Sequence, residues 1–458
     1  MNKPLAWTIS PWALVALLLA GNGPGAGAAL PFLGQGLPKD DLRFLREMTR
    51  DVVEASRVRP GSNGGGRWPL TNSCGFTLIT PGKDTYTAFW PRDFSMGADS
   101  GFVTAEELRN HLLLLCRVQN GPDDLRLARD LRVPAWSIAD HINYDGRPTY
   151  YPGTYASGLD QGAGTFGRLP PMDDHYEFVH IAHKLWKMTG DRTIFRAEVN
   201  GVTVLERLEN AFASPTADRD TGLAETTAAD RAVGFGFCDA EAHTGKLLFA
   251  SLLRYRAAGE LADITGALGR PGRAAGYRQI QRAIRANVGR TFGDPEGRDG
   301  WLRASTGLSS QPDVWGTLYA LHLELLDRAH AAAARKTVAD AVRKGTITLE
   351  GGVRHVPTDR DFRPTTAWER SESPVNTYQN GGYWHTPSGW LIAALWKHDR
   401  PLALQVFGEM IAHLRAQDFR KAPGNGAPWE VFGRNGQARQ NPVYMASVAL
   451  PYSVLKDM

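Results

Sequence analysis

The chain has 458 residues, of which 42% are hydrophobic and 22% are charged. That balance permits a sizeable core and excludes wholesale disorder. The formal net charge of +4 is too small to indicate nucleic acid or an anionic membrane as a partner. The 49 glycines and 28 prolines predict long structured loops between the secondary-structure elements.

The N-terminal segment, residues 1–28, is typical of a secretory signal peptide. Lys3 supplies the positive charge, residues 12–20 form a short apolar run, and residues 26–28 (Ala-Gly-Ala) form a small-residue cleavage site. The apolar run is well short of the ~20 residues that a membrane-spanning helix needs. We therefore expect a secreted or periplasmic mature protein that begins at Ala29 and has no membrane partner. The alternative is an uncleaved N-terminal anchor.

The cysteines are Cys74, Cys116 and Cys238. Their odd number and the lack of a C-x-x-C motif support neither a disulfide framework nor a zinc ribbon. At most one bridge can form, and we expect three buried free thiols.

Helical spacing of apolar residues is the main pattern after the signal segment. Strand signals are few and are limited to short runs such as residues 346–349. The sequence therefore predicts a mainly α chain. The helical stretches are marked by Leu108, Leu112 and Leu115; by Phe178, Ala182 and Leu185; by Leu248, Leu252 and Tyr255; by Val314, Leu318, Leu321 and Leu325; and by Ala403, Val406, Phe407, Met410, Ile411 and Leu414.

A weak internal repeat pairs these helices. Residues 185–192 and 395–401 each combine a helix stop with a helix start, and residues 254–260 are a fainter copy. Such junctions predict antiparallel helical hairpins. About ten to twelve helical stretches of this kind close into an all-α toroid of helical hairpins, with long loops and a few short strands at one end. No linker interrupts the pattern, so residues 29–458 are expected to form one catalytic domain.

Four loop segments carry residues suited to carbohydrate chemistry. In the first, residues 89–94, the ring of Trp90 can stack on a sugar face. Its neighbours Arg92 and Asp93 can hydrogen-bond vicinal hydroxyls. The alternative is a structural salt bridge beside core aromatic residues.

The second and fourth segments each supply a carboxylate. Asp173 and Asp174 stand at a predicted helix start, where an Asp is usually an N-cap. Glu430 follows Trp429 in a loop between Gly- and Asn-rich segments, which suits a general base; the alternative is an exposed loop Glu.

The third segment, residues 378–384, holds two glycines that permit close backbone approach. Asn380, Tyr383 and Trp384 suit a carbohydrate pocket, and the alternative is a tight turn into a helix. The loop over residues 121–170 can wall a sugar subsite or pack on itself. Its polar and aromatic residues are Trp136, Asp140, His141, Tyr144, Asp145, Tyr150, Tyr151, Tyr155 and Asp160.

Two carboxylates on loops at one end of a toroid are what hydrolysis of a glycosidic bond needs. We expect Asp173 to protonate the leaving oxygen and Glu430 to act as the base. The sugar would be bound by residues of the first, third and fourth segments. The rival acids are Asp174 and a second acidic cluster of Glu225, Asp230 and Asp239.

The four segments resemble the six-hairpin glycosidase superfamily, and most closely its neutral/alkaline invertase family. The resemblance covers about residues 85–455 and implies an (α/α)6 toroid, hydrolysis of O-glycosyl bonds with inversion, Asp173 and Glu430 as the catalytic pair, and substrate contacts from Asp230 and Arg231. The matching motifs are Arg92-Asp93-Phe94, Pro171-Met172-Asp173, Thr189-Gly190-Asp191, Ala229-Asp230-Arg231, Tyr378 to Trp384, and Trp429-Glu430.

The chain departs from that family at several positions. Asp174, His175 and Glu177 replace its aromatic pair, and Pro428 precedes Trp429 instead of following it. The resemblance therefore implies a carbohydrate substrate and not sucrose in particular.

Three other interpretations stay open. One is a lyase or a sugar epimerase on the same toroid, which would centre on Tyr and His, or on a His pair. Another is a carbohydrate-binding protein that has lost catalysis, which would not need Glu430. A metal site at His175, His180 and His183 lacks an evident further ligand, so neither a metal nor another cofactor is expected.

Overall fold

A computed structural model of the protein describes residues 36–63, 70–83, 85–126, 132–150, 168–230, 238–294, 296–297, 299–434 and 437–458. The chain separates into two compact units, residues 1–36 and 37–458, and the second unit is described here. The expected signal peptide lies outside the described residues. Within the described residues, no helix has the length and apolarity needed to cross a membrane.

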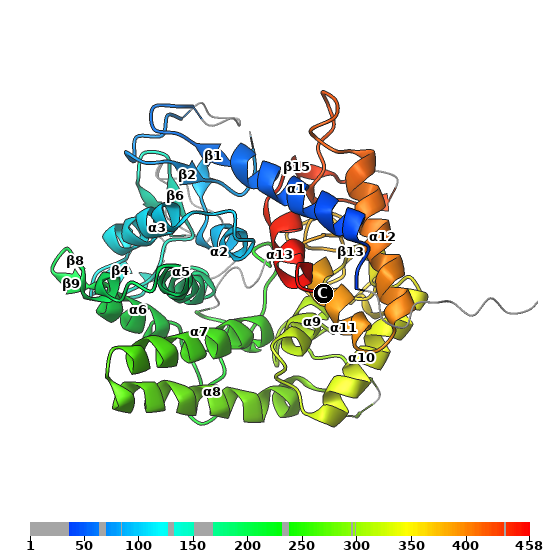
Figure 1. Ribbon diagram of the computed structural model, residues 1–458. Coiled ribbons are helices and arrows are strands. Elements are labelled where there is room, and N and C mark those ends of the chain that lie inside the picture. The colour runs from blue at the N-terminus through cyan, green and yellow to red at the C-terminus, as the bar shows by residue number, and fades with distance from the viewer. Residues whose placement is uncertain are drawn as a thin grey trace, which may run out of the picture. The chain divides into compact units, whose positions relative to one another are not determined.

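Helices dominate the described part of the chain, which confirms the mainly α prediction (Figure 1). Twelve α-helices are described there: α1 (Lys39–Ala55), α2 (Pro91–Asp99), α3 (Ala105–Val118), α5 (Asp174–Thr189), α6 (Val204–Ala213), α7 (Leu248–Ala267), α8 (Pro271–Phe292), α9 (Val314–His322), α10 (Arg328–Arg343), α11 (Ser388–Trp396), α12 (Arg400–Ala416) and α13 (Ala446–Leu455).

Six of these helices, α2, α5, α7, α9, α11 and α13, are called the central helices below. Each contacts the next in this order, and α13 contacts α2. Helices α9, α11 and α13 are buried on nearly every side, as expected for helices that are apolar all round. The other six helices flank them and bury one face each; in α8 the buried residues are Ala274, Ile284, Val288 and Phe292. This arrangement is consistent with the toroid that the sequence predicts.

Short antiparallel sheets lie in the connections between helices. The three-stranded sheet has the order β3–β6–β7, and the two-stranded sheets are β1–β2, β4–β5, β8–β9, β10–β11, β12–β13 and β14–β15. The strands are β1 (Arg57–Val58), β2 (Leu78–Ile79), β3 (Ala88–Phe89), β4 (Leu125–Arg126), β5 (Arg132–Val133), β6 (His141–Asn143), β7 (Pro148–Thr149), β8 (Glu198–Val199), β9 (Val202–Thr203), β10 (Glu225–Thr226), β11 (Gly245–Lys246), β12 (Thr348–Leu349), β13 (Gly352–Val353), β14 (Trp429–Val431) and β15 (Gln440–Pro442).

One predicted hairpin junction is wrong. Residues 254–260 lie inside α7, and the chain turns only after Ala267, before α8 begins at Pro271. Inside α7, a Cβ on Gly259 would lie 2.4 Å from Nε2 of Gln281, the flexible end of a side chain of α8. The junction after α5 is also less direct than expected, because a 3₁₀-helix (Thr193–Arg196) and the β8–β9 hairpin precede α6. The junction between α11 and α12 is as predicted.

The three cysteines are free, as expected. Cys116 and Cys238 are buried, whereas Cys74 is only half-buried. Burial raises the pKa of Cys116 to about 12, so this thiol packs in the core and is not activated as a nucleophile.

Candidate active site

The start of α2 carries the first part of the site. Pro91 occupies the first helical turn, where its missing N–H costs nothing, and Arg92 and Asp93 are buried directly after it. Strand β3 precedes this helix and pairs with β6, with Phe89 opposite Ile142. This pairing brings the beginning of β6, from the loop over residues 121–170, beside the start of α2.

Arg92 gathers three carboxylates. Its Nε and Nη2 donate to the two oxygens of Asp173 at 2.6 and 3.0 Å, so this pair is bidentate. Nη2 also lies 3.8 Å from Asp174 and 3.9 Å from Asp140. Asp173 sits at the N-cap of α5, but its side chain makes no capping bond, because Arg92 holds both of its oxygens.

Asp174, the first residue of α5, is fully buried. Neither of its carboxylate oxygens has a hydrogen-bond partner among the described residues. Burial raises the pKa of Asp174 well above its ordinary value, against the opposing charge of Arg92, and Asp173 raises it further. Burial therefore favours the neutral form of Asp174, beside the ion pair of Arg92 and Asp173.

Aromatic residues cover one side of this group. A hydrogen bond of 2.7 Å joins Nδ1 of His141 to Oδ2 of Asp140. The ring of His141 stacks on the ring of Trp90, with centroids 4.5 Å apart. Trp90 meets the ring of Tyr86 edge-on at 5.0 Å. These contacts fix the ring of Trp90, which is only half-buried, as a platform suited to a sugar face.

Glu430 lies in β14 and is almost fully buried. Its Oε2 accepts a hydrogen bond from the hydroxyl of Tyr86 at 2.5 Å and another from the side-chain amide of Asn441. Burial raises the pKa of Glu430 to about 8, although the two donors lower it, and the charges of Asp93 and Asp239 raise it further. Both donors reach the same oxygen, which leaves Oε1 for another group.

Two further carboxylates act electrostatically on Glu430. Asp239 is half-buried and accepts hydrogen bonds from the amide of Gln379 and from the hydroxyl of Tyr378 at 3.3 Å. Burial raises the pKa of Asp239. Asp93 accepts a hydrogen bond from the hydroxyl of Tyr444, and burial raises its pKa to about 7 against that bond.

The structure thus gathers seven of the residues selected from the sequence, which are Trp90, Arg92, Asp93, Asp173, Asp174, Asp239 and Glu430. We call this set, with Tyr86, Asp140, His141 and Asn441, the carboxylate cluster. Arg231 lies outside the described residues.

Other selected residues have structural partners. The side chain of Asn380 stabilises a loop. It accepts a hydrogen bond from the N–H of Ala367 at 2.7 Å and donates one to the carbonyl of Ser373 at 2.8 Å. Trp384 is fully buried, with its ring edge against Trp315.

The remaining selected residues lie near the cluster or away from it. The backbone of Tyr383 exchanges hydrogen bonds with Phe432, next to β14, at 2.8 and 2.9 Å. Trp429 is half-buried, and the guanidinium of Arg439 lies 5.7 Å from its ring centroid. Asp230 lies 3.7 Å from Arg132, at the edge of a separate cavity.

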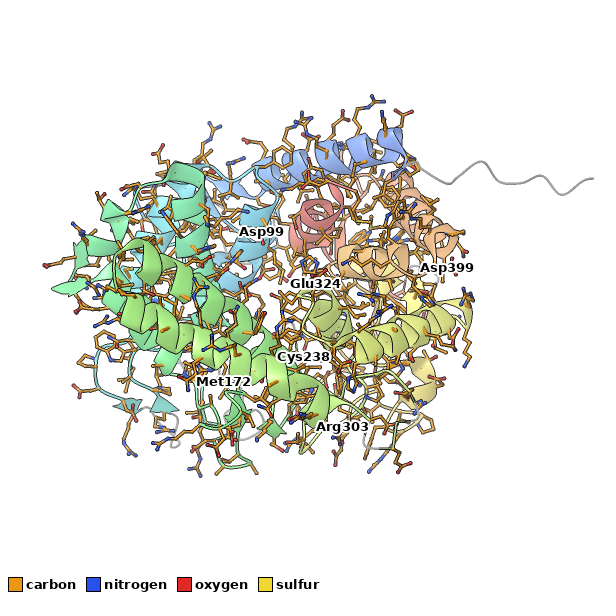
Figure 2. All side chains as sticks on the ribbon, turned by 60° about the horizontal axis from the view of Figure 1, so that its bottom comes forward. Asp99, Met172, Cys238, Arg303, Glu324 and Asp399 are labelled. Atoms are coloured by element: carbon orange, nitrogen blue, oxygen red, sulfur yellow. The ribbon has the colours of Figure 1, made fainter. Side chains whose placement is uncertain are left out.

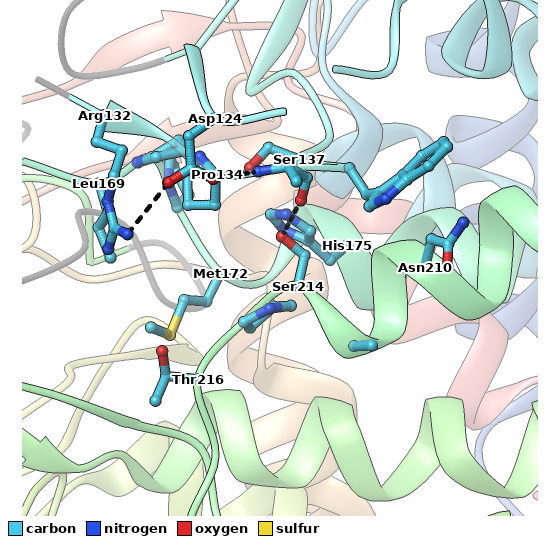
Figure 3. A pocket seen from close by; sticks show the side chains of 16 residues that line it. Asp124, Arg132, Pro134, Ser137, Leu169, Met172, His175, Asn210, Ser214 and Thr216 are labelled. Carbon is cyan, nitrogen blue, oxygen red and sulfur yellow. Dashed lines mark hydrogen bonds and ion pairs between the residues drawn. The ribbon is translucent and has the colours of Figure 1, made fainter. Parts of the chain in front are cut away.

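That cavity has a volume of about 370 Å³ and lies between the segment before α5 and the segment after α6. Figure 3 shows Arg132 paired with Asp124, at 3.3 Å, and Met172 extending toward Thr216. Met172, which directly precedes Asp173, lines this cavity.

Sequence reasoning missed Tyr86 and Asn441, which hold Glu430. Tyr86 belongs to the stretch before Trp90, and Asn441 has a positive φ of 49°, a conformation that Asn tolerates better than most residues. Gln379 lies inside a motif selected from the sequence, yet its neighbours were preferred to it. No pattern along the chain marks these residues, because their partners come from distant segments.

The described residues contain no group of three or more His, Cys, Asp and Glu side chains arranged to hold a metal ion. Of the three histidines considered above as metal ligands, His180 bonds to Glu260 at 2.5 Å and to Asp99 at 3.1 Å.

No protein-family model matches the chain, and a search of curated proteins finds no match either. Solved structures do match. The GH63 mannosylglycerate hydrolase from Thermus thermophilus, in complex with glucose, aligns with a TM-score of 0.56 and 13% identity over 89% of this chain and 99% of that chain. A GH78 family rhamnosidase from a Bacillus species aligns with a TM-score of 0.51 and 11% identity over 92% of this chain but 35% of that chain.

A third structure, described as a wild-type glycosidase, has a TM-score of 0.50 and 14% identity over 92% of this chain and 98% of that chain. At these identities the likeness shows the fold alone. The chain therefore shares its fold with these glycosidases. The resemblance to neutral/alkaline invertases stays a prediction.

Proposed function

We propose that the protein is an exported glycoside hydrolase that cleaves an O-glycosidic bond of an oligosaccharide or glycoside with inversion, on an (α/α)6 toroid. The observation that supports this most is the pair of buried or half-buried carboxylates Asp239 and Glu430. Each is held by side-chain donors from other segments of the chain, and each interacts with the other's charge. The fold shared with glycoside hydrolases agrees with this assignment.

Glu430 is the proposed base. Tyr86 and Asn441 donate to its Oε2, so the carboxylate is oriented and Oε1 can accept a proton from water. In an inverting hydrolase this water attacks the anomeric carbon from the face opposite the leaving group.

Asp239 is the proposed acid, in preference to Asp173. Asp173 is fully buried, and Arg92 occupies both of its oxygens. Because both oxygens of Asp173 already accept hydrogen bonds from Arg92, neither is placed to serve a leaving group. Asp239 is more exposed, and its raised pKa favours the protonated form that an acid needs.

The sugar would lie against Trp90, with its hydroxyls bonded to Asp93 and Asp140. Both carboxylates are already oriented, Asp93 by Tyr444 and Asp140 by His141. Tyr383, which pairs with Phe432 next to β14, and Trp429, the first residue of β14, are proposed to line the same site.

The test is a hydrolysis screen with aryl glycosides and disaccharides, including mannosides and rhamnosides because of the named structural neighbours, and sucrose because of the sequence resemblance. NMR of the first-formed anomer on the best substrate gives the stereochemistry. We expect inversion, and a product with the substrate's own anomeric configuration would reject it.

Matched variants test the two roles. Glu430→Gln should abolish hydrolysis yet still bind the sugar. Asp239→Asn should lower kcat by about 10²–10⁴-fold on substrates with poor leaving groups and much less on activated aryl glycosides, which leave without a proton. Sugar binding without turnover by the wild-type chain would instead favour the non-catalytic interpretation.

A further inference from the structure

A cavity of about 310 Å³ lies among the central helices, and all six of them contribute to its wall. None of Asp93, Asp239 and Glu430 lines it, so it is distinct from the carboxylate cluster. Its volume is that of a site for a small molecule. We call it the axial cavity; its wall includes Asp99 of α2, Lys184 of α5, Arg256 of α7, Tyr319 of α9, Trp390 of α11 and Lys456, which follows α13.

The axial cavity opens to solvent near the last turn of α2. The side chains of Asp99 and Lys184 are 26% and 27% exposed and form an ion pair at 2.8 Å. Lys456 donates to the backbone carbonyl of Asp99 at 3.2 Å. Figure 2 labels Asp99, the last residue of α2, and Glu324, which follows α9. Two ammonium groups therefore stand at the opening, and only Lys184 is described in a pair with a carboxylate.

Further inside the axial cavity, the charged groups pair with one another, but some of their hydrogen-bond donors have no partner among the described residues. Arg256 donates through Nη2 to Glu177 at 2.6 Å, whereas its Nε is buried and has no hydrogen-bond partner among the described residues. Burial and Arg256 work against protonation of His180, but Asp99 and Glu260 raise its pKa to about 10, so this ring is also a cation.

The hydroxyl of Tyr319 is the clearest case of a buried polar group that lacks a hydrogen-bond partner. It is buried, lines the axial cavity, and has no partner among the described residues. Its ring is clamped by stacking on Trp390, with centroids 4.6 Å apart, and on Phe249 at 5.3 Å. The ring therefore cannot swing out to find a partner, and a buried hydroxyl without a partner is unfavourable.

Among the residues that line the axial cavity, hydrogen-bond donors are left without a partner, whereas the acceptors are already used. Tyr319, Arg256 and Lys456 hold donor hydrogens that the described hydrogen bonds do not use, whereas the carboxylates of Asp99 and Glu177 already accept bonds. Glu260 has one buried oxygen without a partner and lies 4.0 Å from Nε of Arg256, but it does not line the axial cavity. The missing partner is therefore an acceptor. The rings of Phe249, Tyr319 and Trp390 form an apolar wall that suits a ligand with a hydrocarbon part.

We propose that the axial cavity binds a small organic anion, whose carboxylate or phosphate group accepts hydrogen bonds from Tyr319, Arg256 and Lys456 while its apolar part contacts the aromatic wall. The proposal is independent of the proposed hydrolase function, because no residue of the carboxylate cluster takes part.

Isothermal titration calorimetry on the full-length chain tests the proposal. The probes are benzoate, phenyl phosphate and inorganic phosphate, with benzyl alcohol as the neutral control. We expect saturable binding of benzoate or phenyl phosphate, weaker binding of inorganic phosphate, and none of benzyl alcohol. The comparison of the first two probes distinguishes a carboxylate from a phosphate ligand.

Two variants locate the binding. Tyr319→Phe and Lys456→Met should each weaken the anion about tenfold, since each removes one donor to a charged group. The controls Tyr255→Phe and Lys344→Met, which lie outside the axial cavity, should bind like the wild type. Tyr319→Phe should also keep or raise the melting temperature of the ligand-free protein, because it removes an unpaired hydroxyl. No saturable binding of any of the three anions, or equal binding by both cavity variants and the wild type, overturns the proposal.

Discussion

At the scale of single residues, the environment of Glu430 sets two effects against each other. Burial disfavours the carboxylate, whereas the hydroxyl of Tyr86 and the amide of Asn441 stabilise it. Burial prevails, and the pKa of Glu430 rises to about 8. A base with this pKa is mostly protonated at neutral pH, so the free enzyme should become more active as the pH rises toward 8.

The substitution Tyr86→Phe should shift the pH dependence of activity. Removing a donor to the ionised carboxylate raises the pKa of Glu430, so the acidic limb of the pH profile of kcat/KM should move to higher pH. Activity at pH 7 should fall and recover in part at alkaline pH. The measurement is kcat/KM against pH, with Tyr277→Phe, away from the cluster, as the control. A limb that stays in place or moves to lower pH would show that Glu430 is not the base.

Asp173→Asn should mainly affect stability. The substitution removes the charge that pairs with the buried guanidinium of Arg92, and breaking such a pair costs about 3–5 kcal/mol. Urea unfolding should show this loss. Asp230→Asn, at a half-exposed site, should change stability by less than about 0.5 kcal/mol. A variant Asp173→Asn that is inactive but as stable as the wild type would restore Asp173 as the acid.

These residues show how far the sequence leads toward the site. Arg92, Asp93 and Glu430 stand out locally, because charged groups beside Trp and Pro are unusual. The expected loops are wrong here, since Arg92 and Asp93 lie in α2 and Glu430 lies in β14. Asp173 looked like the acid because its helix-start position is visible in the sequence, whereas its partner Arg92 comes from 81 residues earlier. Tyr86 lies 344 residues from Glu430, so no local pattern could join them.

At the scale of elements, one glycine lets two segments of the site meet. A Cβ on Gly382 would lie 2.4 Å from Cγ2 of Val431, in β14, and 2.5 Å from the carbonyl oxygen of Tyr378. Gly382→Ala should therefore push β14 away from the turn that holds Gln379. Both the melting temperature and the rate of hydrolysis should fall.

Gly408→Ala is the matched control for Gly382→Ala. Gly408 lies within α12, and no atom comes within 4 Å of a Cβ built there. The substitution should raise stability by about 0.5–1 kcal/mol, because alanine favours a helix. Unfolding curves of both variants check the pair. If Gly382→Ala is as stable and active as the wild type, the close approach at Gly382 is not needed.

Helical periodicity predicted α3, α5, α7, α9 and α12, because each has an apolar side long enough to repeat. It was less reliable at helix ends. Leu325 keeps the spacing of α9, yet that helix ends at His322. The short strands were mostly missed, since a two-residue strand is fixed by its partner and has no pattern of its own.

At the scale of the whole molecule, the proposed export makes a separate prediction. Expression of the full chain in a secreting host should yield a mature protein that begins at Ala29, as N-terminal sequencing would show. Ala28→Asp should block processing, because the cleavage site needs a small residue there. An exported protein that retains Met1 would contradict the cleavage.

The contact of α13 with α1 and α2 has a consequence for synthesis. Thr49 of α1 donates a hydrogen bond to the carbonyl of Val448, 399 residues further along the chain. At about 5–20 residues per second, a ribosome needs roughly 20–80 s to make the intervening segment. During that time α13, which packs on α1, is absent from the nascent chain. The polypeptide therefore stays incompletely folded until its synthesis is nearly finished, and an incompletely folded polypeptide is the form that a secretion channel can thread.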